Sequence, residues 1–432
     1  MSEKTKIALG VILSLVLAFS LAGVSCYFPS SQETLLLPSL PAGEGNLPSQ
    51  IPEFSVCMVI NLPNITIRAD GTIEPQDVPI QRIGNIYTFT DDIVNRTLRI
   101  QRDNIVIDGA GHKIQGAINA AEGVVLQNRS NVTLKNMDVT RFWNGISVTS
   151  CSSITITGTK VMNIGSRAIM LDSCNNSIIS DNVVDDVAIA IEITATSGFS
   201  ANNTVTRNII TSATQGITID GSFSTITENN LANIYLPIGA RGNQTTISKN
   251  NLANGIGGIY LTGSYCTIYG NNVANFSESG MTINLGTNSS IYENSVSYSE
   301  CAIIIQNYED TWIIENNTFY HNNFINNTQT IRVESPSHQN YWDNGSEGNY
   351  WSDYNGADHD GDGIGDTSYM IDANNIDSYP LMTPYESMQQ PNQMLWVYLG
   401  IIGLGVFAAI VIGIMLVSRQ TKAKSSLENI DK

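Results

Sequence analysis

The chain has 432 residues, of which 42% are hydrophobic and 14% are charged, and its formal net charge is −18. A chain of this length holds enough apolar residues for a sizeable core. The acidic balance argues against nucleic acid as a partner, because phosphate backbones attract basic surfaces.

The N-terminal residues 1–26 have the composition of a secretory signal peptide. Two lysines precede an apolar run from Ile7 to Val24 that ends in small residues. Residues 27–60 are rich in Pro, Ser and Gly, so we expect them to form a linker.

Residues 104–343 repeat with a period of about 22 residues, which is typical of stacked solenoid units. Each unit ends in a turn rich in Asn, Asp or Gly. The turn positions are Asn136, Gly158, Asp181, Asn208, Asn229, Asn250, Asn271, Asn294 and Asn316.

Each unit contains two stretches in which β-branched apolar residues alternate with polar ones, as in Gly216–Asp220 and Gly258–Thr262. This period of two is typical of strands, and no helical stripe is present. The sequence predicts an all-β chain folded as a parallel β-helix, with equivalent strands about 4.8 Å apart. We favour right-handed winding, because left-handed β-helices usually run on six-residue sub-repeats and none occurs. The turn asparagines are expected to form a side-chain amide ladder along one corner.

The segments on either side of the repeat, 61–103 and 344–386, are expected to cap the β-helix, because an uncovered end exposes strand edges. After a stalk at 387–394, residues 395–417 are 23 residues without a charge, enough to span a bilayer. Basic residues follow in the tail, 418–432. The sequence therefore predicts a single-pass membrane protein with an extracellular β-helix and a cytoplasmic C-terminus.

Two segments, one where the chain enters the repeat and one where it leaves, carry a family resemblance. The entry segment contains Ile65–Pro75, Pro79–Arg82, Tyr87–Thr90 and Asn104–His112, and the exit segment contains Gly348–Tyr354, Asp358–Asp366, Ile371–Asp372 and Tyr379–Leu381. With the coils, they resemble the NosD-type right-handed β-helix surface proteins of archaea, over residues 61–383. The wider group is the carbohydrate-binding and sugar-hydrolase β-helix repeat. The resemblance implies this fold, but members include lyases, hydrolases, binding proteins and a copper-assembly protein, so it implies no single activity.

An Asp-rich loop in the C-terminal segment has the spacing of a Ca²⁺ site. Carboxylates at Asp358, Asp360, Asp362 and Asp366, with the backbone carbonyl of Ile364, would wrap a tight loop around the ion. The loop resembles those of thrombospondin type-3 and dockerin modules. It departs from them at position 12, where Tyr369 replaces a bidentate acid. We expect a structural Ca²⁺ that orders the cap.

Aligning the repeats predicts a vertical column of outward residues on one face of the β-helix. It consists of Gln127, Thr149, Asp172, Glu192, Asp220, Arg241, Thr262, Asn284 and Gln306. Like charges this close repel unless a cation or a raised pKa relieves them. In β-helix polysaccharide lyases, an acidic cluster on this sheet binds Ca²⁺ and a nearby Arg or Lys takes the proton. Asp172, Glu192, Asp220 and Arg241 are therefore candidates for a catalytic site, for a cation or sugar-binding strip, or for a plain surface ion pair.

Two further sets of residues leave alternatives open. Cys151 and Cys174 fall on adjacent coils, where they form either a disulfide or two free stacked thiols. The aromatic residues of the exit segment either close the end of the core or form a sugar-stacking platform. The candidates for stacking are Trp342, Tyr350, Trp351 and Tyr354.

Asn-x-Ser/Thr sequons occur throughout the exported part. They are at Asn64, Asn95, Asn128, Asn131, Asn175, Asn202, Asn243, Asn275, Asn288, Asn316, Asn326 and Asn344. Export would allow glycosylation of these sites, but a turn built from Asn followed by Ser or Thr generates sequons without any modification.

The function that these features favour is a membrane-anchored surface protein that binds glycans or envelope proteins. A polysaccharide lyase or glycoside hydrolase is the alternative. A copper-related accessory role ranks third, because the four histidines have no ligand spacing with one another or with a Cys or Met run.

Overall fold

The computed structural model describes residues 64–386, apart from 197, 285, 307–313 and 335–338. These residues form a right-handed parallel β-helix, as predicted, and contain no helix. No helix among them is long and apolar enough to cross a membrane. The predicted signal peptide, linker, stalk, transmembrane segment and tail lie outside the described residues.

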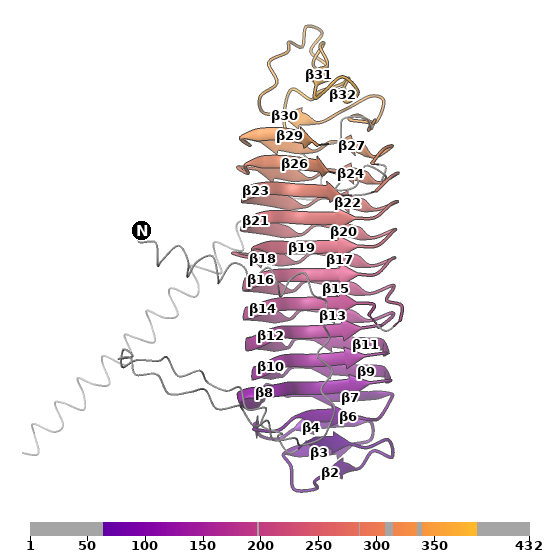
Figure 1. The fold of residues 1–432 in the computed structure, drawn as a ribbon, viewed down its shortest axis with the longest axis vertical. Helices are drawn as coiled ribbons and strands as arrows, with labels where there is room; N and C mark the ends of the chain where they lie inside the picture. Colours follow the sequence, from indigo (N-terminus) through magenta and orange to yellow (C-terminus); the bar gives the residue numbers. More distant parts are fainter. Residues whose placement is uncertain (1–63, 197, 285, 307–313, 335–338, 387–432) are drawn as a thin grey trace, which may run out of the picture. The chain divides into compact units, whose positions relative to one another are not determined.

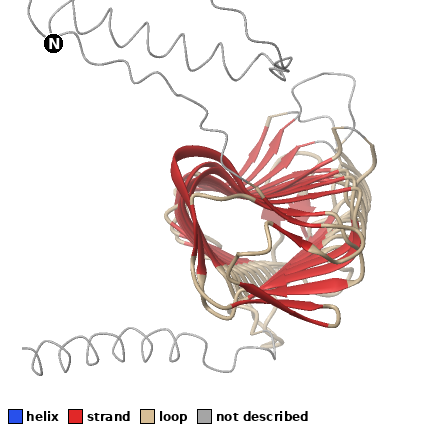
Figure 2. Ribbon diagram, turned by 90° about the horizontal axis from the view of Figure 1, so that it is seen from below, coloured by secondary structure: helices blue, strands red, loops and turns tan. Residues whose placement is uncertain are grey.

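Each coil contributes one long strand, bent in the middle, and one short strand (Figures 1 and 2). The long strands form most of an 18-stranded sheet that wraps two sides of the coil. They are β8 (Lys113–Gln127), β10 (Asp138–Thr149), β12 (Lys160–Asp172), β14 (Val183–Thr194), β16 (Ile209–Asp220), β18 (Asn230–Ala232) with β19 (Leu236–Arg241), β21 (Asn251–Thr262), β23 (Asn272–Asn284), β25 (Ser295–Ser297) with β26 (Cys301–Gln306), and β28 (Asn323–Ile325) with β29 (Gln329–Val333).

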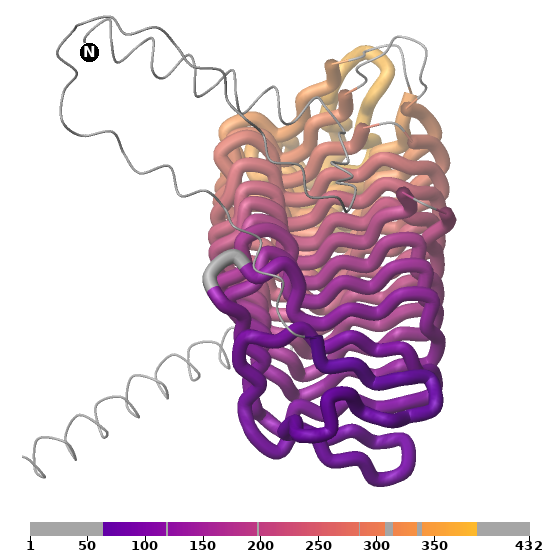
Figure 3. Tube along the Cα trace, turned by 60° about the horizontal axis from the view of Figure 1, so that its bottom comes forward, coloured from indigo at the N-terminus to yellow at the C-terminus, as the bar shows by residue number. Residues whose placement is uncertain are grey.

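The short strands form the third side, a 12-stranded sheet completed by the hairpin β3–β4. They are β7 (Ile105–Asp108), β9 (Ser130–Lys135), β11 (Ser152–Thr157), β13 (Ile178–Ser180), β15 (Thr204–Thr206), β17 (Thr225–Thr227), β20 (Thr246–Ser248), β22 (Thr267–Tyr269), β24 (Ser290–Tyr292) and β27 (Thr318–Tyr320). Figure 3 shows the coils following one another along the axis in sequence order.

The core is a set of vertical stacks of aliphatic side chains. Ile191, Ile217, Ile238 and Ile259 pair directly from coil to coil and are at most 1% exposed. Burying each such side chain stabilises the fold by about 1.5–3 kcal/mol relative to leaving it in water. The alternation that predicted strands therefore also places the apolar residues inside.

The N-terminal cap holds β1 (Ile65–Ile67), β2 (Ile73–Glu74), β3 (Ile80–Ile83), β4 (Ile86–Phe89), β5 (Ile93–Val94) and β6 (Leu98–Ile100). The antiparallel β3–β4 hairpin covers the first edge of the 12-stranded sheet. Parallel stacking already begins here, because β4 pairs with β7 and β6 with β8.

The predicted asparagine ladder is present at the corner between the short strands and the next long strands. Each side-chain Oδ1 accepts hydrogen bonds from the backbone N–H and the Nδ2 of the ladder residue one coil earlier, at 2.8–3.1 Å. The ladder residues are Asn182, Asn208, Asn229, Asn250, Asn271, Asn294, Asn322 and Asn349.

The turn positions predicted at the two ends of the repeat were partly wrong. Asn316 is not in the ladder, because the coil after Asn294 carries an insertion and supplies Asn322 instead. Asn316 belongs to a different corner, where it adopts a left-handed φ of 58°. Asp181 also has a left-handed φ and lies one residue before the ladder position, which Asn182 occupies.

The C-terminal cap comprises β30 (Tyr350–Trp351), β31 (Tyr369–Met370) and β32 (Ile376–Asp377). Asp377, fully buried, ends the ladder: its carboxylate accepts from the backbone N–H of Asn349 at 2.8 Å and from Trp351 Nε1 at 2.7 Å. Burial raises the pKa of Asp377 to about 6, despite these hydrogen bonds, which favour the charged form.

We predict that replacing one ladder amide destabilises the whole solenoid. Asn250→Ala would leave the backbone N–H of Asn229 without its acceptor inside the protein and would remove one of the hydrogen bonds of its Nδ2, since Asn250 is 1% exposed. The free energy of unfolding should fall by about 2–4 kcal/mol. Chemical denaturation of the variant measures this. Asn251→Ala removes two hydrogen bonds at the surface, one to Asn230 and one from Asn272, and should stay within about 0.5 kcal/mol of wild type. An equal effect of both substitutions would contradict the prediction.

We predict that Asp377 makes stability depend on pH. Its folded pKa lies above the usual value, so the fold favours the neutral acid. The contribution of Asp377 to stability is therefore greatest below pH 4 and declines as pH rises towards 6. An amide cannot ionise, so the stability of Asp377→Asn relative to wild type should rise by up to about 3 kcal/mol from pH 4 to pH 7, on top of any constant cost of placing its NH2 group opposite the N–H of Tyr379. Denaturation curves at both pH values measure the difference. A difference that is the same at both values would contradict the assignment.

Candidate functional site

The outward face of the second halves of the long strands, here called the long-strand face, carries most of the predicted column. Thr149 pairs with Asp172, Asp220 with Arg241, and Arg241 with Thr262 on successive strands. The prediction that these residues are vertical neighbours is confirmed.

Glu192 was assigned to this column wrongly. Asp172 pairs with Thr194, whereas Glu192 pairs with Met170 and Thr218, one outward position earlier on the strand. The cause is the run from Ala188 to Thr194, in which isoleucine alternates with small or polar residues over seven positions. Two frames fit the motif equally well, and a shift of two residues keeps the same side outward.

The acids of this face are held differently from one another. The carboxylate of Asp172 accepts hydrogen bonds from the backbone N–H of Thr196 at 3.0 Å and from the hydroxyls of Thr196, Thr194 and Ser173. Burial alone would raise the pKa of Asp172, but these hydrogen bonds outweigh it and lower the pKa. Asp172 is therefore suited to staying charged and not to exchanging a proton near neutral pH.

Glu192 is paired with Arg167, and its side chain is only 14% exposed. Asp220 and Arg241 are exposed and on adjacent strands, yet no ion pair joins them among the pairs that the described residues form. Thr194 lies between Asp172 and Asp220, so their backbones are about 10 Å apart. The arrangement therefore offers separate polar contacts and not one compact catalytic cluster.

The Asp-rich loop brings three of its predicted ligands together. Carboxylate oxygens of Asp358, Asp360 and Asp362 lie within 4.8 Å of one another. Asp358 also accepts from the backbone N–H groups of Gly361 and Gly363, at 2.7 and 3.0 Å. Both glycines have a left-handed φ, of 76° and 90°, which lets the loop turn tightly around the carboxylates.

The other two predicted ligands, Ile364 and Asp366, are placed differently. The carboxylate of Asp366 accepts from the backbone N–H and from Nδ1 of His359, which lowers the pKa of Asp366. It lies outside the group of three carboxylates. Ile364 forms an antiparallel bridge with Leu381, which ties the loop to the end of the cap.

The sugar-stacking prediction is wrong for two of the four aromatic residues. Trp342 and Trp351 are 0% and 1% exposed, so no ligand reaches their faces. Trp342 stacks on Phe319 with ring centroids 4.3 Å apart, and Trp351 stacks on Tyr369 at 4.2 Å. They close the end of the core, because the last coil would otherwise expose its apolar stack.

Tyr350 and Tyr354 are half-buried. The hydroxyl of Tyr354 donates to the carbonyl oxygen of Thr367 at 2.5 Å, and Tyr350 lies in β30. Both tyrosines therefore help to build the cap.

Cys151 and Cys174 stack on adjacent coils, as predicted, but the disulfide is not formed. Both thiols are buried, and each donates to the backbone carbonyl two residues earlier: Cys151 to Thr149 at 3.2 Å and Cys174 to Asp172 at 3.3 Å. The neighbouring Cys174 thiol lowers the pKa of Cys151 to about 7, while the Cys151 thiol and burial raise the pKa of Cys174. The alternative of two free thiols in a ladder is the one that the structure shows.

Two groupings were not found from the sequence. Asp91, Asp92 and His112 place possible ligand atoms within 4.8 Å of one another beside the first coils. The backbone N–H of Lys113 donates to Asp92, 21 residues earlier, which is about the length of one coil. This spacing could have been recognised from the sequence.

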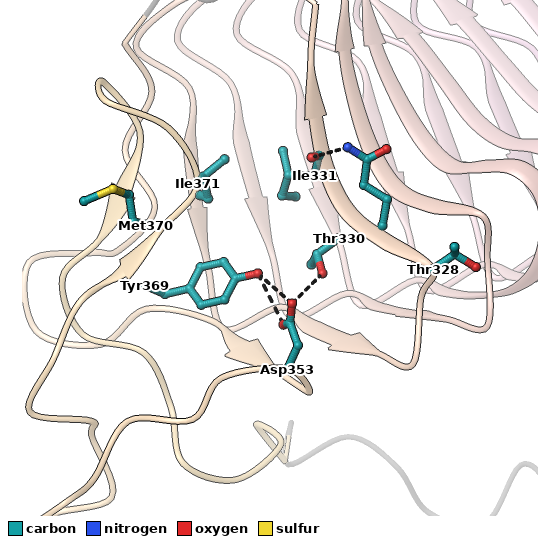
Figure 4. Close-up of a pocket in the computed structure, with 8 residues that line it drawn as sticks. Thr328, Thr330, Ile331, Asp353, Tyr369, Met370 and Ile371 are labelled. Atoms are coloured by element: carbon teal, nitrogen blue, oxygen red, sulfur yellow. Dashed lines mark hydrogen bonds between the residues drawn. The ribbon is translucent and has the colours of Figure 1, made fainter.

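The second grouping is a cavity of about 290 Å³ between β29 and the cap (Figure 4). There the hydroxyl of Tyr369 donates to the carboxylate of Asp353, at 3.0 and 3.2 Å, and Thr330 donates to the same group at 3.4 Å. Burial, followed by the charge of Asp353, raises the pKa of Tyr369 to about 12. These three groups form their hydrogen bonds with one another, and the bonds attach the cap to β29.

Two family models match the coils. The right-handed beta helix region matches residues 85–232, and the family described as periplasmic copper-binding protein (NosD) matches residues 200–356. The chain is a NosD-type parallel β-helix protein. The NosD-type chain is also 44% identical, over 55 residues, to a probable ABC transporter binding protein NosD of Pseudomonas aeruginosa. That match covers 13% of this chain and 13% of the relative.

Solved structures similar to the NosD-type chain match it at low identity and with TM-scores below 0.5. The A-module of the mannuronan C-5 epimerase AlgE6 of Azotobacter vinelandii is 10% identical, with 60% of this chain and 80% of that one covered and a TM-score of 0.45. The catalytic domain of a GH87 α-1,3-glucanase is 14% identical, with 62% and 63% covered and a TM-score of 0.43. These likenesses concern the fold and say nothing about the chemistry of this chain.

Proposed function

We propose that this chain is a membrane-anchored extracellular β-helix protein whose long-strand face binds carbohydrate chains or other envelope components. The observation that carries the proposal is the vertical alignment of polar outward residues on that face. Asp220, Arg241 and Thr262 follow one another on paired strands, with Thr194 and Asp172 continuing the column below. Their spacing of about 4.8 Å per coil suits a linear polymer lying along the axis.

Polar residues at this spacing suit sugars, because hydroxyl groups need both donors and acceptors. Thr194, Thr218 and Thr262 offer both, Asp220 offers acceptors only, and Arg241 offers donors only. The acids differ in environment, and Asp172 and Glu192 are already engaged by neighbours. This favours binding over the lyase or hydrolase alternative, in which one of the acids must exchange a proton.

The proposal includes a structural Ca²⁺ in the C-terminal cap. The converging oxygens of Asp358, Asp360 and Asp362 suit a hard cation that prefers oxygen ligands. The copper-related role has less support, because the described histidines lie apart. His112 lies beside Asp91 and Asp92, His321 beside Glu347, and His359 beside Asp366.

We predict that Arg241→Ala weakens binding to an acidic or neutral polysaccharide by about tenfold or more, because a hydrogen bond from a charged group contributes about 1.5–3 kcal/mol. A glycan array probed with the full-length protein in detergent identifies the ligand, and titration of that ligand measures the change. Lys135→Ala, which removes a cation from the short-strand sheet, is the matched control and should bind as wild type does.

The same samples should be tested for new reducing ends and unsaturated ends. Binding without turnover supports the proposal. Turnover that is lost in Asp220→Ala would establish the enzyme alternative instead.

We predict that Ca²⁺ stabilises the cap through the three clustered carboxylates. At about 100 times its dissociation constant, the ion should raise the free energy of unfolding by about 2.7 kcal/mol. Calorimetry and thermal melting with Ca²⁺ or a chelator measure this. Asp360→Asn should lose most of the effect, whereas Glu228→Gln, which removes an equal charge far along the chain, should keep it. No heat of binding at millimolar Ca²⁺ would remove the claim.

A further inference from the structure

The corner between the long strands and the short strands that follow them gathers many of the sequons; we call it the sequon edge. It consists of the turns that lead into β9, β11, β13, β15, β17, β20, β22, β24 and β27. The sequon asparagines on it are Asn128, Asn131, Asn175, Asn202, Asn243, Asn288 and Asn316. All of them except the half-buried Asn175 are exposed.

The backbone of this corner does not by itself require asparagine. Left-handed φ values recur in these turns, and Asn202 and Asn288 adopt them at 54° and 57°. Other coils place Phe223, Gln244 and Tyr265 in the same conformation, at 56–58°. Asparagine is the easiest of these residues to accommodate there, but the turn forms without it. Turn chemistry therefore does not fully account for the sequons.

The aromatic residues of the sequon edge point to what its asparagines carry. Phe199, Phe223 and Tyr265 are 64%, 50% and 62% exposed, although nothing in the turn needs an apolar ring. Asn202 donates its N–H to Ser222, beside Phe223, and Tyr265 donates to Thr287, beside Asn288. Phe223 donates to the carbonyl oxygen of Asn243 at 3.0 Å. The backbones of Phe223 and Tyr265 are therefore each about one coil, or 4.8 Å, from that of a sequon asparagine.

The acceptor nitrogens are also available, in contrast to those of the buried ladder. Within the described residues, the side chain of Asn288 donates only to its sequence neighbour Thr287, at 2.9 Å on the surface. Asn243 is exposed, and its Oδ1 accepts from the backbone N–H of Ser264 at 2.9 Å. The Nδ2 of Asn250, by comparison, is bound on both sides inside the protein.

We propose that Asn202, Asn243 and Asn288 carry N-linked glycans whose first sugars rest on Phe223 and Tyr265. In the attachment step, a transferase forms a bond between Nδ2 and the anomeric carbon of a lipid-phosphate-linked oligosaccharide. The bond from that carbon to the phosphate breaks, and Nδ2 loses one proton. The apolar faces of the sugars then cover rings that would otherwise meet water. The proposal rests on the export of the β-helix, which is part of the proposed function.

The test uses full-length protein isolated from the membranes of the organism that makes it, digested and measured by glycopeptide mass spectrometry. We expect glycan mass on the peptides of all three asparagines. If the signal peptide has been removed and these peptides carry no glycan, the glycan proposal is overturned while export stands. If the β-helix is reached by a labelling reagent only after the cells are opened, export itself fails and takes the glycan proposal with it.

Matched variants separate the sequon from the fold. Thr204→Val removes the sequon of Asn202 but keeps a β-branched side chain in β15, whereas Thr204→Ser keeps the sequon. We expect the glycan on Asn202 to be lost in the first and retained in the second. Enzymatic removal of glycans should lower the melting temperature of wild type, and lower it less in the Phe223→Ala, Tyr265→Ala double variant. An equal decrease in both would overturn the stacking of sugars on the rings.

Discussion

The asparagine ladder is the interaction on which the rest of the structure depends. Hydrogen bonds between backbones hold neighbouring coils together, but similar strands leave the vertical register open to slippage by two residues. A buried amide that is bound to the coil before and the coil after removes this freedom, because any shift would leave its donors unpaired. The register in turn determines which outward residues become neighbours. The arrangement of side chains on the long-strand face therefore depends on the asparagine ladder.

Much of the fold was predictable from the sequence because a solenoid converts a linear period directly into contacts. The alternation of apolar and polar residues gave the strands, and regular offsets between coils gave the contacts of Asp220 with Arg241 and of Cys151 with Cys174. Prediction failed where the local pattern was ambiguous or interrupted. Glu192 lies in a run that fits two frames, and Asn316 follows an insertion that breaks the counting.

The site was less predictable than the fold, since side-chain partners depend on packing that a period does not contain. The sequence contained the acids of the long-strand face, but not the threonines that engage Asp172 or the arginine that pairs with Glu192. It also contained the tryptophans of the cap without showing that they are buried. Trp342 and Trp351 can be buried at the end of the core because their ring nitrogens have acceptors there. Trp342 donates to Asn375, and Trp351 donates to Asp377.

The amide-to-amide bonds of the ladder also have a direction, because each Nδ2 donates to the Oδ1 of the next coil and each Oδ1 accepts from the coil before. Asp377 can end such a chain because a carboxylate accepts without having to donate in return. Interior coils, by contrast, are equivalent. The Nδ2–Oδ1 bonds that join Asn229 to Asn250 and Asn250 to Asn271 link the same atoms, and each spans 21 residues. Duplicating or deleting one of these 21-residue units would present every donor with an identical acceptor. The height of this molecule is therefore open to change by whole coils during evolution or engineering, whereas its two terminal caps are not interchangeable.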